Sequence, residues 1–148
     1  MEKNIVNLAK YLLSKGIDSP LRIQKILFFL RFEELKENSK TKSESYFNKE
    51  NNFQAWIYGP VNERTFYYLQ TYFQSEDEKE AYILNDEDIK EIDKIYGKWF
   101  NKYKNKSASW LINESHRNKS WINARGNLGI DEICREYLKE DETFIQFE

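Results

Sequence analysis

The residues best suited to chemistry stand together at Glu114-Ser115-His116. A histidine beside a hydroxyl or a carboxylate could act as the general base of a hydrolase or transferase. Adjacent residues on an irregular segment rarely direct their side chains to one point, and no third group completes the set. We therefore expect no enzymatic activity, and we interpret His116 as an anchor that holds a loop through both ring nitrogens.

The chain offers few ligands for a metal or a cofactor. It contains one histidine and one cysteine, Cys134, which excludes a multi-histidine metal site, a cysteine zinc cage and an internal disulfide. Neither a phosphate-binding glycine loop nor a dinucleotide fingerprint is present. We predict no cofactor, a buried structural role for Cys134, and a reducing, cytoplasmic environment.

One stretch, residues 98–125, combines positive charge with aromatic rings. Its basic residues are Lys98, Lys102, Lys104, Lys106, Arg117, Lys119 and Arg125, and its interleaved rings are Trp99, Tyr103, Trp110 and Trp121. This pattern is typical of nucleic-acid binding, so a nucleic-acid-binding regulator is one hypothesis. The alternative is that the lysines face solvent while the rings face the core. An acidic protein partner would suit the same patch, and the net charge of −2 gives no general attraction to nucleic acid.

Length and composition predict one compact, helix-dominated α+β domain over residues 1–148. Glycine and proline are scarce, at 5 and 2 residues, which disfavours a β-sandwich with many turns. Apolar spacing predicts about six helices, over 3–15, 20–37, 61–73, 86–104, 108–115 and 130–138. A small sheet of two or three strands is expected near residues 45–59, where Tyr46-Phe47 could form an edge strand. An acidic linker is predicted over 76–88. No apolar run approaches the ~20 residues of a membrane-spanning helix, and no signal peptide is apparent.

The stretch from Phe53 to Val61 is the sharpest local feature. Its first half alternates as a strand does, and Gly59-Pro60 predicts an abrupt turn into a helix with Pro60 at the first helical position. Two polar residues, Gln24 and Lys25, interrupt the apolar run of the 20–37 helix. They lie either on a narrow solvent stripe or in a groove used for binding. Ser19, Asn85 and Ser107 are the expected helix caps.

Three segments in this order resemble the Panacea domain, the SocA-like or GepA-like antitoxin domain of bacterial and phage toxin–antitoxin pairs. Residues 21–29 (LRIQKILFF) resemble its "LQKLLYY" helix, and residues 53–61 (FQAWIYGPV) resemble its "EAWxxGPV" corner. The late segment that begins at Ser107 resembles its "LSxxTH" end, with Trp121 five residues after His116. The chain departs from the family at Gln54, where an acidic residue is common, at Ser115 in place of threonine, and at Lys119-Ser120 in place of Gly-Pro.

The resemblance implies a mainly helical domain without enzymatic activity, carried by a prophage or another mobile element. It implies an antitoxin that neutralises the product of a neighbouring gene by direct protein–protein contact. Some family members act as adaptors, so a protease or chaperone is a further expected partner. Tryptophan and tyrosine are suited to such contacts, although Trp56 and Trp121 could equally be core residues. The residues expected to bind the partner or to carry the family motif are Gln24, Lys25, Trp56, Tyr58, Gly59, Pro60, Tyr67, Tyr68, Trp110, His116 and Trp121.

Overall fold

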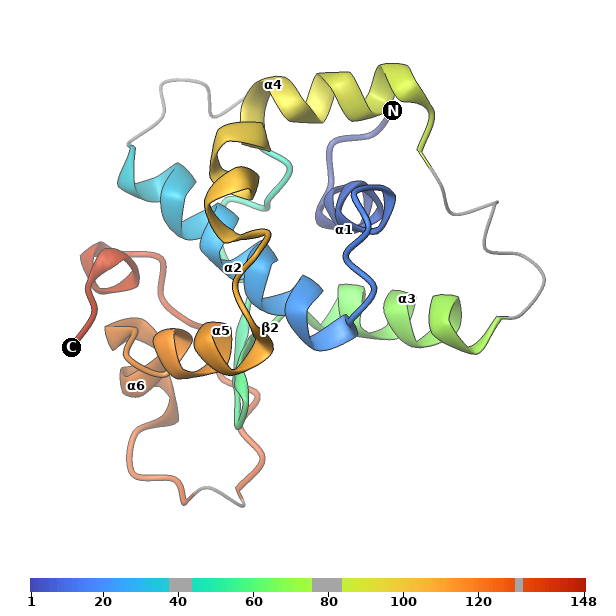
Figure 1. Ribbon diagram of the computed structural model, residues 1–148. Helices are drawn as coiled ribbons and strands as arrows, with labels where there is room; N and C mark the ends of the chain where they lie inside the picture. The colour runs from blue at the N-terminus through green and yellow to red at the C-terminus, as the bar shows by residue number, and fades with distance from the viewer. Residues whose placement is uncertain (38–43, 76–83, 130–131) are drawn as a thin grey trace.

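The computed structural model describes residues 1–37, 44–75, 84–129 and 132–148 (Figure 1). Within these ranges the chain forms a helix-dominated α+β domain, as predicted. Its elements in order are α1 (Ile5–Ser14), α2 (Pro20–Lys36), β1 (Gln54–Trp56), β2 (Gly59–Val61), α3 (Glu63–Gln74), α4 (Asp86–Tyr103), α5 (Ala108–Ser115), α6 (Lys119–Arg125) and the 3₁₀ turn η3 (Glu142–Ile145). No helix in the described ranges combines the length and the apolar character needed to cross a membrane.

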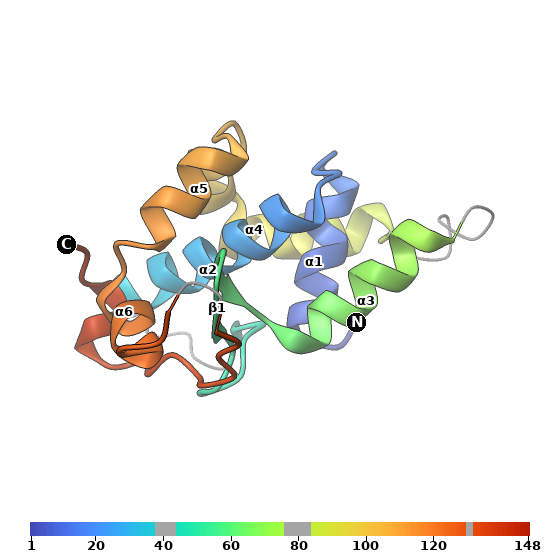
Figure 2. The same cartoon turned by 90° about the horizontal axis from the view of Figure 1, so that it is seen from below.

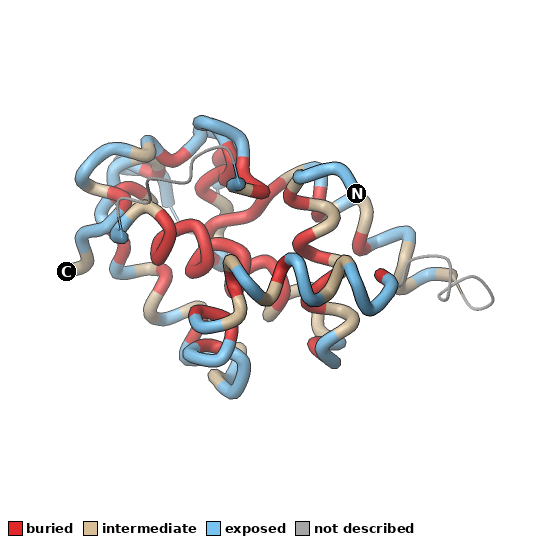
Figure 3. Tube along the Cα trace, turned by 90° about the horizontal axis from the view of Figure 1, so that it is seen from above, coloured by how far each residue is buried: buried red, intermediate tan, exposed pale blue. Residues whose placement is uncertain are grey.

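The central element is α2, and α1, α3, α4, α5, β2 and η3 pack against it (Figures 1 and 2). Every residue from Ile23 to Glu34 is buried, which appears in Figure 3 as a continuous buried stretch in the middle of the molecule. A helix that is apolar nearly all round is expected to occupy this position. Ser19 caps its N-terminus, and Pro20 occupies the first helical position, both as predicted.

Side-chain caps begin each of the described α-helices. Asn85 and Ser107 cap α4 and α5 as expected from the sequence. Three further caps were not predicted, and the first of them is Asn4, which caps α1. Asn62 caps α3, and Asn118 caps α6, a helix that lies in a stretch where only an irregular segment was expected. Each cap oxygen accepts a bond from a backbone N–H that has no partner within its helix.

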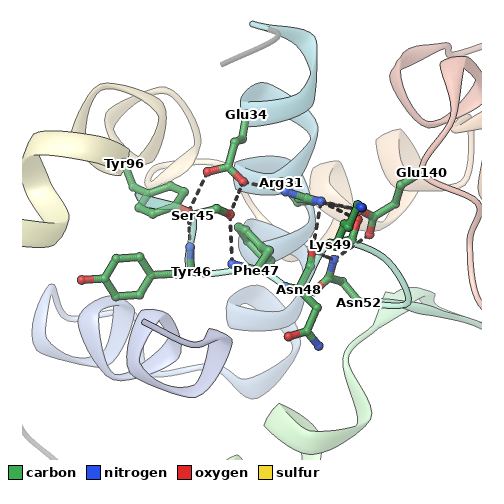
Figure 4. Close-up of polar contacts among 10 residues, drawn as sticks. All are labelled: Arg31, Glu34, Ser45, Tyr46, Phe47, Asn48, Lys49, Asn52, Tyr96 and Glu140. Atoms are coloured by element: carbon green, nitrogen blue, oxygen red, sulfur yellow. Dashed lines mark hydrogen bonds and ion pairs between the residues drawn. The ribbon is translucent and has the colours of Figure 1, made fainter. Parts of the chain in front are cut away.

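A buried polar network holds two irregular segments against α2 (Figure 4). The Arg31 guanidinium lies 2.7 Å from carboxylate oxygens of both Glu34 and Glu140. Glu34 also accepts hydrogen bonds from Ser45 and from the Tyr96 hydroxyl. Burial raises the pKa of Glu140, and the charge of Arg31 opposes that rise. Because a lone buried charge is costly, these mutual partners allow residues 45–52 and the C-terminal tail to dock on α2.

The predicted edge strand at Tyr46-Phe47 is wrong. Both side chains are buried in the core, and the Tyr46 backbone N–H bonds to the Tyr96 hydroxyl instead of to a strand. The sheet has two antiparallel strands, β1 and β2, and covers 54–61, later in the chain than expected. Of the predicted acidic linker, residues 76–83 lie outside the described residues.

The helix predicted over 130–138 is also wrong for residues 132–138, which are not helical and form a single antiparallel bridge, between Tyr137 and Gln54. Their backbone pairs with β1: the Ala55 N–H donates to the Glu136 carbonyl, and the Leu138 N–H donates to the Phe53 carbonyl. This distant partner, invisible to local spacing, overrides the helical pattern. Cys134 is buried as predicted, whereas its neighbour Ile133 is 82% exposed. Ile130 lies outside the described residues.

Candidate functional site

Gly59 and Pro60 begin β2, the second strand of a tight hairpin, and do not start a helix. Trp56 pairs with Gly59, and Ala55 pairs with Pro60, across a two-residue turn at Ile57-Tyr58. Pro60 therefore lies in β2, which corrects its expected place at a helix start. The position suits proline because the Ala55 N–H points away from it, to Glu136, so the pair exchanges no hydrogen bond.

Gly59 is required at this corner for two reasons. Its φ of +109° is a conformation that residues with a Cβ rarely adopt. A Cβ there would also lie 2.5 Å from the Ser115 Oγ and 2.8 Å from the Lys25 Cε. The hairpin can approach α2 and α5 this closely only because residue 59 has no side chain.

The first family-like segment, residues 21–29 of α2, forms hydrogen bonds with the hairpin and with the residue that follows it. Gln24 exchanges two hydrogen bonds with the backbone of Asn62, at 2.9 and 3.0 Å. Lys25 donates a 3.0 Å bond to the Pro60 carbonyl. Their exposed fractions are 4% and 0%, so the solvent-stripe interpretation is wrong. Both residues also line the groove described below.

The late segment, which begins at Ser107, forms hydrogen bonds with the hairpin from the other side. The Trp121 indole N–H donates to the Trp56 carbonyl at 2.9 Å, and the Trp121 ring stacks on His116 with centroids 4.4 Å apart. Arg125 donates to the Ala55 carbonyl, also at 2.9 Å. All three family-like segments therefore meet at one hairpin. Arg125 was grouped with the basic patch, and no feature of the sequence indicated its buried role.

The arrangement around His116 does not resemble a catalytic set. Glu114 pairs with Arg117, and the Ser115 hydroxyl donates to the Ile112 carbonyl. His116 bonds to the Ile57 backbone, and burial lowers its pKa. Its Nε2 has no hydrogen-bond partner among the described residues, so the predicted anchoring through both nitrogens holds for one nitrogen only. Those residues also contain no group of three or more histidine, cysteine or acidic side chains placed to hold a metal.

Beside the hairpin lies an apolar cavity of about 500 Å³, which we call the hairpin groove. Its walls come from the N-terminal turns of α2, from the hairpin and from α3. The apolar side chains that define it are Leu21, Trp56, Tyr58, Phe66 and Phe73. The sequence did not single out Leu21, Phe66 or Phe73. The available signal was that α3 carries more aromatic residues than one buried face requires.

The exposure of the rings shows which of them a partner could reach. Tyr58 is 62% exposed at the hairpin turn, and Tyr67 is 53% exposed on α3, next to Phe66. Trp56 is half-buried: it packs on Phe66 at a centroid distance of 5.0 Å and also lines the groove. It is therefore a core residue on one side and a surface residue on the other.

Tyr67 and His116 do not line the groove, and the other three rings among the expected residues, Tyr68, Trp110 and Trp121, lie away from it. Tyr68 turns toward α1, where Lys10 lies over its ring. Trp110 is 36% exposed on α5 and packs on Phe29. Trp121 is half-buried behind the hairpin. Tyr68, Trp110 and Trp121 therefore either stabilise the fold or belong to a surface other than the hairpin groove.

Several residues of the basic and aromatic stretch, residues 98–125, make contacts within the fold. Trp99 and Tyr103 are 8% and 3% exposed, so these two rings face the core, as the alternative interpretation predicted. Lys98 and Lys102 form ion pairs with acidic residues of the described chain. Few rings remain on which nucleic-acid bases could stack.

Comparison of the chain with protein-family models, with curated proteins and with solved structures finds no match. The resemblance to the Panacea domain consequently rests on its three motifs, and the geometry above is the independent basis for a functional proposal.

Proposed function

We propose that this protein is a Panacea-like antitoxin that neutralises a partner toxin by direct binding through the hairpin groove. The observation that carries the proposal is the groove itself, which is apolar, already formed and rimmed by the exposed ring of Tyr58. Aromatic residues around a concave apolar surface are the usual anchors of protein–protein contacts.

The support beneath the groove favours a binding surface that keeps its shape. Gln24 and Lys25 hold one side of the hairpin, and Trp121 and Arg125 hold the other. A surface that is already ordered loses little conformational entropy when a partner binds. The residues that carry the family resemblance thus shape the groove more than they contact the partner.

The proposal is tested by co-expression with each neighbouring gene. One neighbour should arrest growth when expressed alone, and this protein should restore growth and co-elute with that neighbour's product. Tyr58→Ser and Phe73→Ser should weaken both effects because each removes an aromatic side chain of the groove. Ile133→Ser is the matched control, since it removes an exposed apolar side chain outside the groove.

Rescue that survives both groove substitutions would locate binding elsewhere on the protein. Growth arrest that persists beside every neighbouring toxic gene would contradict the antitoxin proposal. The half-life of the toxin, measured with and without this protein, separates blocking from delivery to a protease. A salt-sensitive mobility shift with DNA or RNA would instead favour the regulatory alternative.

A further inference from the structure

One cation, Lys25, lies in the wall of the hairpin groove, and no other described residue that lines this groove is charged. Lys25 has no solvent-exposed surface, yet it lines the hairpin groove among apolar and amide side chains. Its ammonium has three N–H groups, and the Pro60 carbonyl is the acceptor found for it in the described chain. No ion pair among the described residues includes Lys25.

Two other cations, Arg31 and Arg125, are buried in the described chain, and each has more hydrogen-bond acceptors than Lys25. Arg31 contacts two carboxylates. Arg125 donates to three backbone carbonyls, those of Ala55, Gly129 and Glu132. Both guanidinium groups thus have several acceptors each, as buried charges generally require. Lys25 is the exception among them, and it is also the one that lines the groove.

In the part of the chain that the structure describes, the elements packed around Lys25 supply no negative charge to compensate it. On α5 the titratable group facing it is His116, whose own pKa is lowered, first by burial and then by the charges of Lys25 and Arg125. The groove-lining residues of α3 are uncharged, and the hairpin contributes only the phenol of Tyr58. Burial accordingly lowers the pKa of Lys25 to about 7.

We infer that the hairpin groove receives a partner segment that places one carboxylate, flanked by apolar side chains, against the Lys25 ammonium. This inference rests on the proposed function and specifies the chemistry of the partner. The apolar flanks cover the walls, and the carboxylate accepts the N–H groups that lack an acceptor. The ammonium can keep its bond to Pro60, because two of its three N–H groups have no acceptor in the described chain.

Charge complementarity selects this occupant over others. In a site with little water, an opposite charge is attracted more strongly than it is at the surface. A neutral apolar segment would leave the ammonium as poorly satisfied as before. A phosphate or a second carboxylate would bring additional negative charge that no other groove-lining cation could meet.

A pair of small probes tests this preference without the toxin. 4-Phenylbutyrate carries a carboxylate on an apolar stem, and 4-phenylbutyramide is its neutral counterpart. Each compound is titrated into the full chain at pH 6.5 and its binding is measured by calorimetry. The acid should bind at least about tenfold more tightly than the amide, because this ratio corresponds to the free energy of one hydrogen bond between charged groups. Raising the pH to 9 should reduce the affinity for the acid toward that for the amide, because few Lys25 side chains remain protonated.

Two variants locate the effect. Lys25→Met should bind the acid and the amide equally, and its fold is checked by circular dichroism. Lys119→Met, which removes an exposed lysine outside the groove, should behave as the wild type. The inference is overturned if wild-type protein binds acid and amide equally, if it binds neither, or if Lys25→Met retains the preference for the acid.

These results are separable from those that test the antitoxin proposal. A clear preference for the acid, together with failure of every co-expression rescue, would overturn the proposed function and leave the carboxylate site standing. Rescue by wild-type and Lys25→Met protein alike, with no acid preference, would overturn only the carboxylate site.

Discussion

Replacement of Gly59 by alanine tests how closely the hairpin approaches its supports. The new Cβ would meet the Ser115 Oγ at 2.5 Å and the Lys25 Cε at 2.8 Å, and both side chains are fully buried with little room to shift. Overpacking of this kind typically costs about 1–3 kcal/mol. The φ of +109° adds backbone strain of about 1–3 kcal/mol for a residue with a Cβ. We expect Gly59→Ala to lower the free energy of unfolding by about 4 kcal/mol.

Urea denaturation followed by tryptophan fluorescence measures this change, provided that the slope of the transition is unaltered. Gly16→Ala is the matched control. Gly16 has a φ of +90°, but beyond its two chain neighbours no atom of the described residues lies within 4 Å of the position of its Cβ, so only the strain remains. If the two variants lose the same stability, the proposed collision with Ser115 and Lys25 is refuted. Ser115→Ala in the Gly59→Ala background should recover part of the loss, because it removes the nearest atom.

Other substitutions probe the supports and the rim. Between pH 7 and 9.5 the unfolded chain holds the Lys25 proton, whose ordinary pKa is 10.5, while the folded chain releases it near 7. The free energy of unfolding of the wild type should therefore rise with pH in this window. Lys25→Met should be more stable than the wild type at pH 7 by up to about 4 kcal/mol, and its stability should rise less with pH. A variant whose stability depends on pH as steeply as that of the wild type would rule this out. Arg31→Met leaves two buried carboxylates without their cation and should cost about 3–5 kcal/mol in urea denaturation, and a loss below 1 kcal/mol would argue against the buried network. Trp121→Phe keeps a ring on His116 but loses the indole hydrogen bond, so about 1 kcal/mol should be lost, and an unchanged midpoint would contradict that role. Tyr58→Ser should change stability by less than about 0.5 kcal/mol, since the side chain is 62% exposed, and a larger loss would show that the ring supports the fold.

Local signals were sufficient for most of the helices. Ser19-Pro20 predicted the start of α2, and Asn85 and Ser107 predicted the starts of α4 and α5. Each of these signals acts within one turn of the chain, through a side-chain oxygen and a nearby backbone N–H. The continuous apolar run of α2 likewise predicted its central position, because a helix with apolar residues on every side must be surrounded.

The candidate site was predicted in its parts but not in its assembly. The sequence indicates a corner at Trp56, Tyr58, Gly59 and Pro60 and a helix after it, but it starts that helix at Pro60, whereas Pro60 and Val61 belong to β2 and α3 begins at Glu63. The hairpin depends on Ala55 bonding to Glu136, some 80 positions later in the chain. The same contact holds residues 132–138 in a non-helical conformation, although their apolar spacing suits a helix.

The amino-acid sequence by itself determined most of the helices, the caps of α2, α4 and α5, and the residues that make up the three motifs. Only the tertiary structure decided that these motifs close around one hairpin, that Gln24 and Lys25 are buried beneath it, and that a groove opens beside it. The reason is physical. Caps and periodicity depend on neighbours within a few residues, whereas the burial of Lys25 and the pairing of β1 depend on groups 35 to 80 positions away, which meet only when the chain has folded.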